Sequence, residues 1–105
     1  MKSAIDLDLK YLDMIRQILR AHLPASAKVF MFGSRTTGRA KPFSDIDLLI
    51  NSNKELTLHE LAQLNTAFDD ALLPYKVDIA DANLIAAEFK AAIKDQLVAI
   101  DLFEK

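Results

Sequence analysis

Two aspartates separated by one residue are the part of the sequence best suited to chemistry. Asp45 and Asp47 follow a polar loop and open an apolar run that predicts a strand over 45–50. Because side chains alternate between the faces of a strand, the two carboxylates should point the same way. Like charges this close repel each other unless a cation or a proton offsets them. Magnesium fits the pair, because it prefers oxygen ligands and keeps water and substrate phosphates in its shell.

A glycine and a serine lie upstream of the aspartates, directly after a predicted strand over 28–32. Gly33 permits a sharp turn that exposes backbone N–H groups to an anion, and Ser34 adds a hydroxyl donor. The loop that follows is basic, with Arg35, Arg39 and Lys41. Each feature alone is most simply an ordinary turn, a solvated loop or a pair of exposed aspartates. Their conjunction favours a phosphate site beside a cation site.

The loop does not fit a P-loop, the obvious alternative for a glycine-rich phosphate site. Gly33 and Gly38 have the glycine spacing of that motif, but Arg39 and Ala40 stand where lysine and serine or threonine are needed. Pro42 would also interrupt the helix that should follow.

The rest of the pattern predicts the elements that position these residues. Apolar residues recur at helical spacing in three segments: 5–23, 57–72 and 84–103. Three short apolar runs predict strands: 28–32, 45–50 and 75–80. Thr57 and Glu60 have the spacing of a capping box, and the loop over 34–44 has room for a short helix only. The order predicts an α/β (α+β) fold, with a small, mixed three-stranded sheet packed against helices.

Composition limits the classes of protein and of site. With 105 residues, 51% of them hydrophobic, the chain is expected to form a single domain over 1–105. The lack of cysteine excludes disulfides and thiolate zinc sites. A net charge of -2 with interspersed signs argues against a broad nucleic-acid or membrane surface. No apolar run spans a bilayer and the N-terminus lacks a basic signal region, so a cytoplasmic location is expected.

The motif as a whole resembles that of a known family. Gly33-Ser34, ten residues and Asp45-Ile46-Asp47, within GSRTTGRAKPFSDIDLLI, are similar to the signature of the DNA polymerase beta-like nucleotidyltransferases. The close spacing, Gly38, Ser44 and the apolar tail after Asp47 are most similar to the minimal nucleotidyltransferases of prokaryotes. The resemblance extends over nearly the whole chain.

The resemblance implies the nucleotidyltransferase fold and a set of site residues. The nucleotide-binding residues that it implies are Gly33, Ser34, Arg35 and Ser44. The catalytic residues that it implies hold two Mg²⁺ ions, which Mn²⁺ can replace, and they are Asp45, Asp47 and Asp78. Asp78 matches by its position on the strand predicted over 75–80, and Asp81 is the alternative for the third carboxylate.

The resemblance also implies a reaction and a partner. Such enzymes transfer a nucleotide, here AMP from ATP, to an acceptor hydroxyl. Similar minimal nucleotidyltransferases pair with helical HEPN proteins as antitoxins of type VII toxin–antitoxin systems and add AMP to a tyrosine of the toxin. A homo- or hetero-oligomer is therefore expected, and because the chain ends within its last predicted helix, a partner is expected to bring the acceptor.

Three other functions remain open from the sequence. The chain could be a non-catalytic module that neutralises a partner by contact, or a nucleotidyltransferase that acts on a small-molecule or RNA acceptor. A sugar-nucleotide transferase that uses Asp-x-Asp is disfavoured by Gly33-Ser34 upstream and by the short length.

Overall fold

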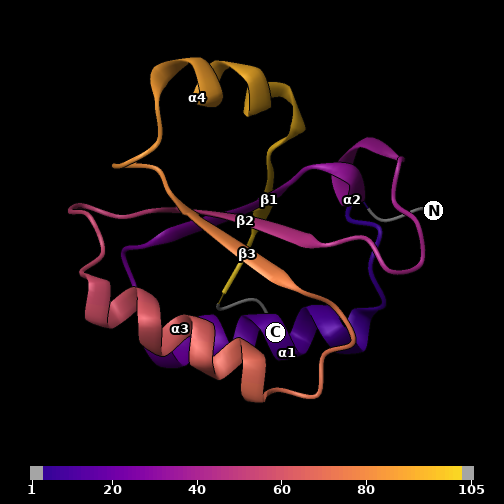
Figure 1. The fold of residues 1–105 in the computed structure, drawn as a ribbon, viewed down its shortest axis with the longest axis horizontal. Coiled ribbons are helices and arrows are strands. Elements are labelled where there is room, and N and C mark those ends of the chain that lie inside the picture. The colour runs from indigo at the N-terminus through magenta and orange to yellow at the C-terminus, as the bar shows by residue number, and fades with distance from the viewer. Residues whose placement is uncertain (1–3, 103–105) are drawn as a thin grey trace.

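A mixed four-stranded sheet organises the chain, whose computed structural model describes residues 4–102 (Figure 1). The strands are β1 (Lys28–Phe32), β2 (Ile46–Asn51), β3 (Val77–Asp81) and β4 (Val98–Ile100), and they lie in the order β3-β2-β1-β4. β2 runs parallel to β3, whereas β1 runs antiparallel to both β2 and β4. The two strands predicted to carry the aspartates are therefore neighbours.

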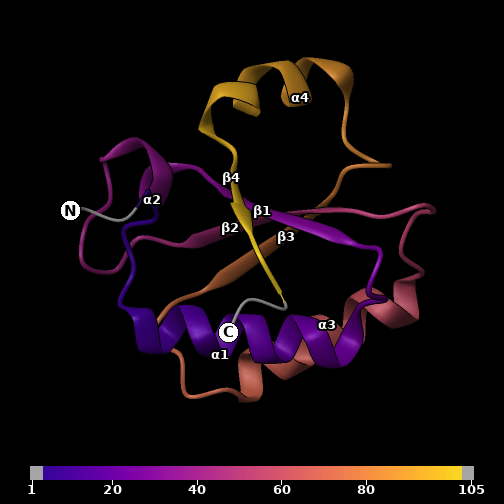
Figure 2. The same cartoon turned by 180° about the vertical axis from the view of Figure 1, so that it is seen from behind.

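Helices cover the two faces of this sheet unequally. α1 (Leu9–His22) and α3 (Leu58–Asp70) lie together against one face, and the short α4 (Ala87–Ile93) lies over the other (Figures 1 and 2). The four-residue α2 (Ser34–Thr37) follows β1, and a single 3₁₀ turn, η1 (Lys94–Gln96), follows α4. The main core lies under α1 and α3, and a smaller cluster lies under α4.

The alternation of side chains in the strands separates these two cores. In β1, Val29 and Met31 belong to the main core, while Phe30 and Phe32 belong to the smaller cluster. In β2, the residues of the main core are Ile46, Leu48 and Ile50, each of them fully buried. The odd-numbered residues that alternate with them along β2, including Asp47, therefore lie on the face of the sheet that α4 covers.

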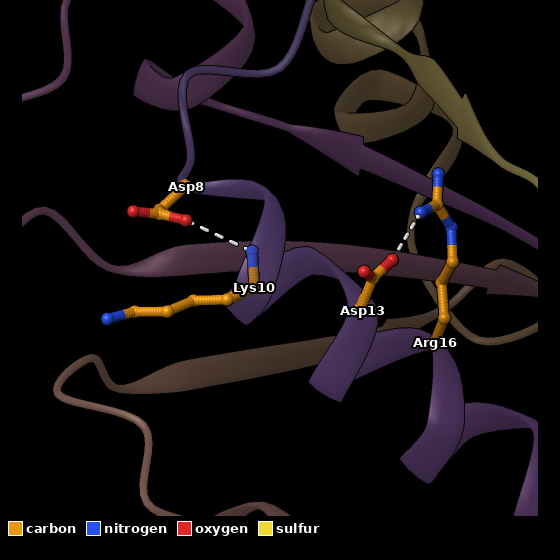
Figure 3. A network of polar contacts seen from close by, with 4 residues as sticks. All are labelled: Asp8, Lys10, Asp13 and Arg16. Carbon is orange, nitrogen blue, oxygen red and sulfur yellow. Dashed lines mark hydrogen bonds and ion pairs between the residues drawn. The ribbon is translucent and has the colours of Figure 1, made fainter.

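The first helix begins later than the sequence pattern predicts. The predicted range opens at residue 5, but Asp8 accepts a hydrogen bond from the Lys10 N–H at 3.0 Å and caps a helix that starts at Leu9 (Figure 3). One turn on, Arg16 Nη1 lies 3.0 Å from Asp13 Oδ1. Ile5 is buried all the same, because the segment before the cap packs into the main core.

The third helix confirms the predicted capping box. The Thr57 hydroxyl accepts from the Glu60 N–H at 3.0 Å, and Glu60 Oε1 accepts from the Thr57 N–H at 2.9 Å.

Among residues 4–102, no helix has the length and apolar character needed to cross a membrane.

The C-terminal region differs from the prediction of a helix over 84–103. Helix is confined to α4, and the 3₁₀ turn η1 leads into β4, which pairs with β1 between Val29 and Met31. The sheet therefore has four strands instead of the predicted three. Ile100 follows Ile93 at helical spacing, but it is a strand residue that packs in the main core. β4 pairs with the backbone N–H and C=O groups at the edge of β1, which would otherwise be left without strand partners. Residue 103 lies outside the described residues.

Candidate active site

Asp47 and Asp78 lie side by side on neighbouring strands. The parallel register of β2 and β3 pairs Asp47 with Asp78, and the antiparallel register of β1 and β2 pairs Phe32 with Asp47. Val77 and Ile79 pack against the main core, so Asp78 faces the opposite side, as Asp47 does. The structure therefore brings two of the three predicted carboxylates together on the face that carries α4.

Asp45 lies immediately before β2, on an exposed part of the chain. Its charge contributes to the environment of Asp47, since burial, Asp78 and Asp45, in that order, raise the pKa of the Asp47 carboxyl. Asp78 is about half exposed, and its Oδ1 lies 3.6 Å from Lys76 Nζ. The three carboxylates thus form a negative cluster. Asp47 is its central member, and the negative charges of Asp78 and Asp45 disfavour the ionised form of its carboxyl.

Gly33 brings the turn after β1 up against this cluster. Its backbone has φ 86° and ψ -153°, a conformation that only glycine adopts freely. A Cβ atom built on Gly33 would lie 2.5 Å from Asp47 Oδ2, well inside van der Waals contact. The predicted glycine turn and the predicted carboxylates are therefore direct neighbours, and the absence of a side chain at residue 33 is what makes room for the Asp47 carboxylate.

Two residues near this turn were not predicted from the sequence. Gln96 Oε1 accepts a hydrogen bond from the Gly33 N–H at 3.0 Å, so this N–H is engaged by the protein itself. Phe89 of α4 packs edge to face on Phe32, with ring centroids 5.8 Å apart. These contacts tie α4 and η1 to the carboxylate side of the sheet. No local pattern could reveal them, because Gln96 lies 63 residues from Gly33.

Arg35 and Ser44, both predicted to bind the nucleotide, make their contacts with the protein itself. The Arg35 side chain is buried, and its guanidinium donates to the carbonyl oxygens of Ser44 and Asp6. The Ser44 hydroxyl accepts from the Lys41 N–H at 2.8 Å. Gly33 lies beside Asp47, whereas the Arg35 guanidinium and the Ser44 hydroxyl oxygen are each engaged by backbone groups of the protein.

The alternative third carboxylate, Asp81, points away from the cluster. It lies three residues after Asp78 on β3, and therefore on the face of the main core. The side chain is buried and accepts from the Leu56 N–H at 2.7 Å and from the Asn83 N–H at 2.9 Å. Asp81 therefore has a structural role at the start of the third helical segment, and Asp78 is the carboxylate next to Asp47.

The donor set fits a hard divalent cation that keeps other ligands. Asp45, Asp47 and Asp78 offer only oxygen atoms, and the repulsion that raises the pKa of Asp47 is relieved by a bound cation. Among residues 4–102, no three His, Cys, Asp or Glu side chains gather closely enough to hold a metal ion by themselves. The carboxylates could therefore supply part of a shell, with the remainder left to water and phosphate oxygens.

Known proteins are similar to this chain in sequence and in fold. Residues 12–105 match the family of the nucleotidyltransferase domain. A relative in Haemophilus influenzae, named as a probable protein adenylyltransferase, MntA, is 36% identical over 107 residues, which cover 100% of this chain and 93% of the relative.

Two solved structures share the fold. A toxin–antitoxin structure with AMP-PNP superposes with a TM-score of 0.73 at 22% identity, covering 86% of this chain and 72% of the other. A tri-AMPylated HEPN toxin of Shewanella oneidensis in complex with its MNT antitoxin gives a TM-score of 0.65 at 20% identity, covering 88% and 71%. The family match and the relative agree with the motif of Gly33-Ser34 and Asp45-x-Asp47: the chain belongs to the nucleotidyltransferase domain family.

Proposed function

We propose that this nucleotidyltransferase transfers AMP from ATP to a tyrosine hydroxyl of a helical HEPN partner and so acts as the antitoxin of a toxin–antitoxin pair. The observation that carries the proposal is the pairing of Asp47 with Asp78 beside the Gly33 turn. In this arrangement the carboxylates would hold a cation next to the turn that would bind phosphate, on one face of the sheet. Both sites are needed to bind the triphosphate of a metal-bound nucleotide.

The choice of AMP and of a protein acceptor depends on the relatives. The Haemophilus influenzae relative is named for adenylyl transfer to protein, and it is similar over the full length of this chain. The Shewanella oneidensis complex pairs an AMPylated HEPN toxin with a protein of this fold. A HEPN protein is therefore the partner to test first.

Each residue of the site has a part in the proposed reaction. Asp45, Asp47 and Asp78 would hold two Mg²⁺ ions, which when bound supply charge neutralisation on the phosphates and lower the pKa of the acceptor hydroxyl. Gly33 and Ser34 would orient the triphosphate through the backbone and the serine hydroxyl. The acceptor hydroxyl would lose its proton to solvent and its oxygen would attack the α-phosphorus in line, while the bond from the α-phosphorus to the bridging oxygen breaks and pyrophosphate leaves. Positioning and charge supply most of the rate enhancement, so no covalent intermediate with the protein is required.

The direct test is to incubate the purified protein with ATP, MgCl₂ and a HEPN protein as the candidate partner, and to measure the intact mass of both proteins. We expect the partner to gain the mass of one or more AMP groups, and we expect no gain when EDTA is present. A partner of unchanged mass, with both proteins folded and in complex, would contradict the proposal. If Asp47→Asn still neutralises a toxic partner in cells, neutralisation is by contact and not by modification.

A second prediction separates Asp78 from Asp81. Asp78→Asn should abolish transfer with little change in stability, because a half-exposed pair with Lys76 contributes at most about 1 kcal/mol. Asp81→Asn should retain transfer but lower the free energy of unfolding by about 1–3 kcal/mol, because the two backbone N–H groups donate to different oxygens of Asp81 and asparagine replaces one of these oxygens by an NH₂ donor. Urea denaturation and the mass assay measure the two effects. The reverse pattern would make Asp81 the third carboxylate of the site.

A further inference from the structure

Arg35 is 5% exposed, and its guanidinium lies where three segments of the chain meet. Its Nη2 and Nε atoms donate to the Ser44 carbonyl oxygen, at 2.9 Å and 3.2 Å, and its Nη1 donates to the Asp6 carbonyl oxygen at 2.8 Å. The Arg35 carbonyl oxygen in turn accepts from the Asp6 N–H at 2.7 Å. The guanidinium carbon also lies 4.3 Å from the centroid of the Tyr75 ring.

These contacts connect the segment that leads to Asp45 with the segment that leads to Asp78. Ser44 is bonded directly to Asp45, and Tyr75 stands three residues before Asp78. The two segments also meet through the Ile46 N–H, which donates to the Lys76 carbonyl oxygen at 2.9 Å. Arg35 therefore holds the start of β2 and the approach to β3 against each other, just ahead of the site.

Asp45 depends on such a contact more than Asp47 does. Asp47 lies within β2 and is paired on both sides, with Phe32 in β1 and with Asp78 in β3. Asp45 precedes the strand, and its side chain is exposed. The turn before it is closed by the Ser44 N–H, which donates to the Lys41 carbonyl oxygen at 3.0 Å. The Arg35 guanidinium fastens this turn to the rest of the protein through the Ser44 carbonyl.

Only arginine can make this set of contacts. Its planar guanidinium presents five donors in a fixed fork and can stack on an aromatic ring while it donates in its own plane. Lysine has one compact ammonium group, which could reach the Ser44 or the Asp6 carbonyl but could not also stack on Tyr75.

We infer that Arg35 is a positioning residue of the site: through Ser44 and Tyr75 it fixes Asp45 relative to Asp78. This inference depends on the proposed function, in which both carboxylates act on the same nucleotide. The side chain itself is buried and makes its contacts with protein groups. Its loss should therefore reduce kcat, which depends on the geometry of the carboxylates, far more than it raises KM for ATP.

The test compares Arg35→Lys with Arg20→Lys, the same change at an exposed position of α1. We expect Arg35→Lys to lower kcat for partner modification by about 10²-fold while KM for ATP changes by less than about threefold. Hydrogen–deuterium exchange of the isolated protein, which needs neither ATP nor partner, should show faster exchange over residues 38–46. Arg20→Lys should match the wild type in both measurements.

A third variant separates positioning from general stability. Leu19→Ala removes a fully buried side chain of the main core and should lower the melting temperature at least as much as Arg35→Lys does. At a temperature where all variants are folded, we expect Leu19→Ala to keep nearly full kcat. An equal loss of kcat in Leu19→Ala, or unchanged exchange and kcat in Arg35→Lys, would overturn the inference. If the wild type is inactive but Arg35→Lys still exchanges faster than the wild type over residues 38–46, the proposed function is contradicted, and the role of Arg35 in holding this segment is supported.

Discussion

Asp47→Asn should lower the rate of adenylyl transfer by about 10³-fold or more and leave the fold unchanged. Asp47 is the central carboxylate of the cluster, next to Asp78 in the sheet and in contact distance of the Gly33 turn. A metal ligand at the reacting phosphate contributes several kcal/mol of transition-state stabilisation, and each 1.36 kcal/mol corresponds to about tenfold in rate. Asparagine keeps the shape of the side chain but removes the charge. The mass assay with ATP and the HEPN partner measures the rate.

The same variant should be at least as stable as the wild type when no metal is present. Burial, Asp78 and Asp45 raise the pKa of Asp47, so the native state holds this proton more tightly than the unfolded state. The free energy of folding that this protonation contributes is fully present at pH values below the pKa of Asp47 in the unfolded chain. It is lost as the pH rises through the higher pKa of Asp47 in the folded protein. Melting temperatures measured in EDTA across this acidic range should fall with rising pH less steeply in Asp47→Asn than in the wild type.

The matched control for charge is Asp69→Asn, the same change at an exposed position of α3. It should keep the wild-type rate, because α3 lies on the other face of the sheet (Figure 1). A folded Asp47→Asn protein that transfers AMP at the wild-type rate would show that the carboxylate cluster is not the site of the reaction.

The sequence was sufficient for the parts of the fold that depend on local patterns. Side-chain alternation in β2 put Ile46 and Asp47 on opposite faces, and the Thr57–Glu60 capping box marked the start of α3. The helical spacing of Ile93 and Ile100 led to the wrong prediction of a helix as far as residue 103. A strand can bury Ile100 equally well, and the edge of β1 needs a partner strand. Local periodicity does not contain information on which edge of the sheet is open.

Residue type identified which side chains are chemically competent, but not what they contact. Arg35 stands in a basic loop beside a predicted phosphate turn, and its charge favoured a phosphate as partner. In the structure, however, carbonyl oxygens and the Tyr75 ring surround it. Gln96 carried no signal at all, because its bond to Gly33 exists only once α4 and η1 fold back over the sheet. Both cases depend on contacts between segments that are distant along the chain.

Gly33→Ala should lower the transfer rate by about 10²-fold, mainly by displacing the carboxylate of Asp47. The added Cβ would lie 2.5 Å from Asp47 Oδ2, and that oxygen is the movable end of a side chain, so the carboxylate should rotate away. A misplacement of about 1 Å in a reacting group costs about 10²-fold in rate. The backbone at φ 86° adds a strain of about 1–3 kcal/mol, which urea denaturation should detect.

Gly38→Ala is the matched control, because it introduces the same side chain at the other glycine of the loop. Gly38 also has a positive φ, 76°, but apart from the adjoining residues no atom lies within 4 Å of the Cβ position. It should therefore cost about 1–2 kcal/mol of stability from the left-handed backbone and leave most of the transfer rate. If the two variants lose the same activity for the same loss of stability, strain alone explains the effect. If only Gly33→Ala loses activity, the loss reports the contact between residue 33 and the Asp47 carboxylate.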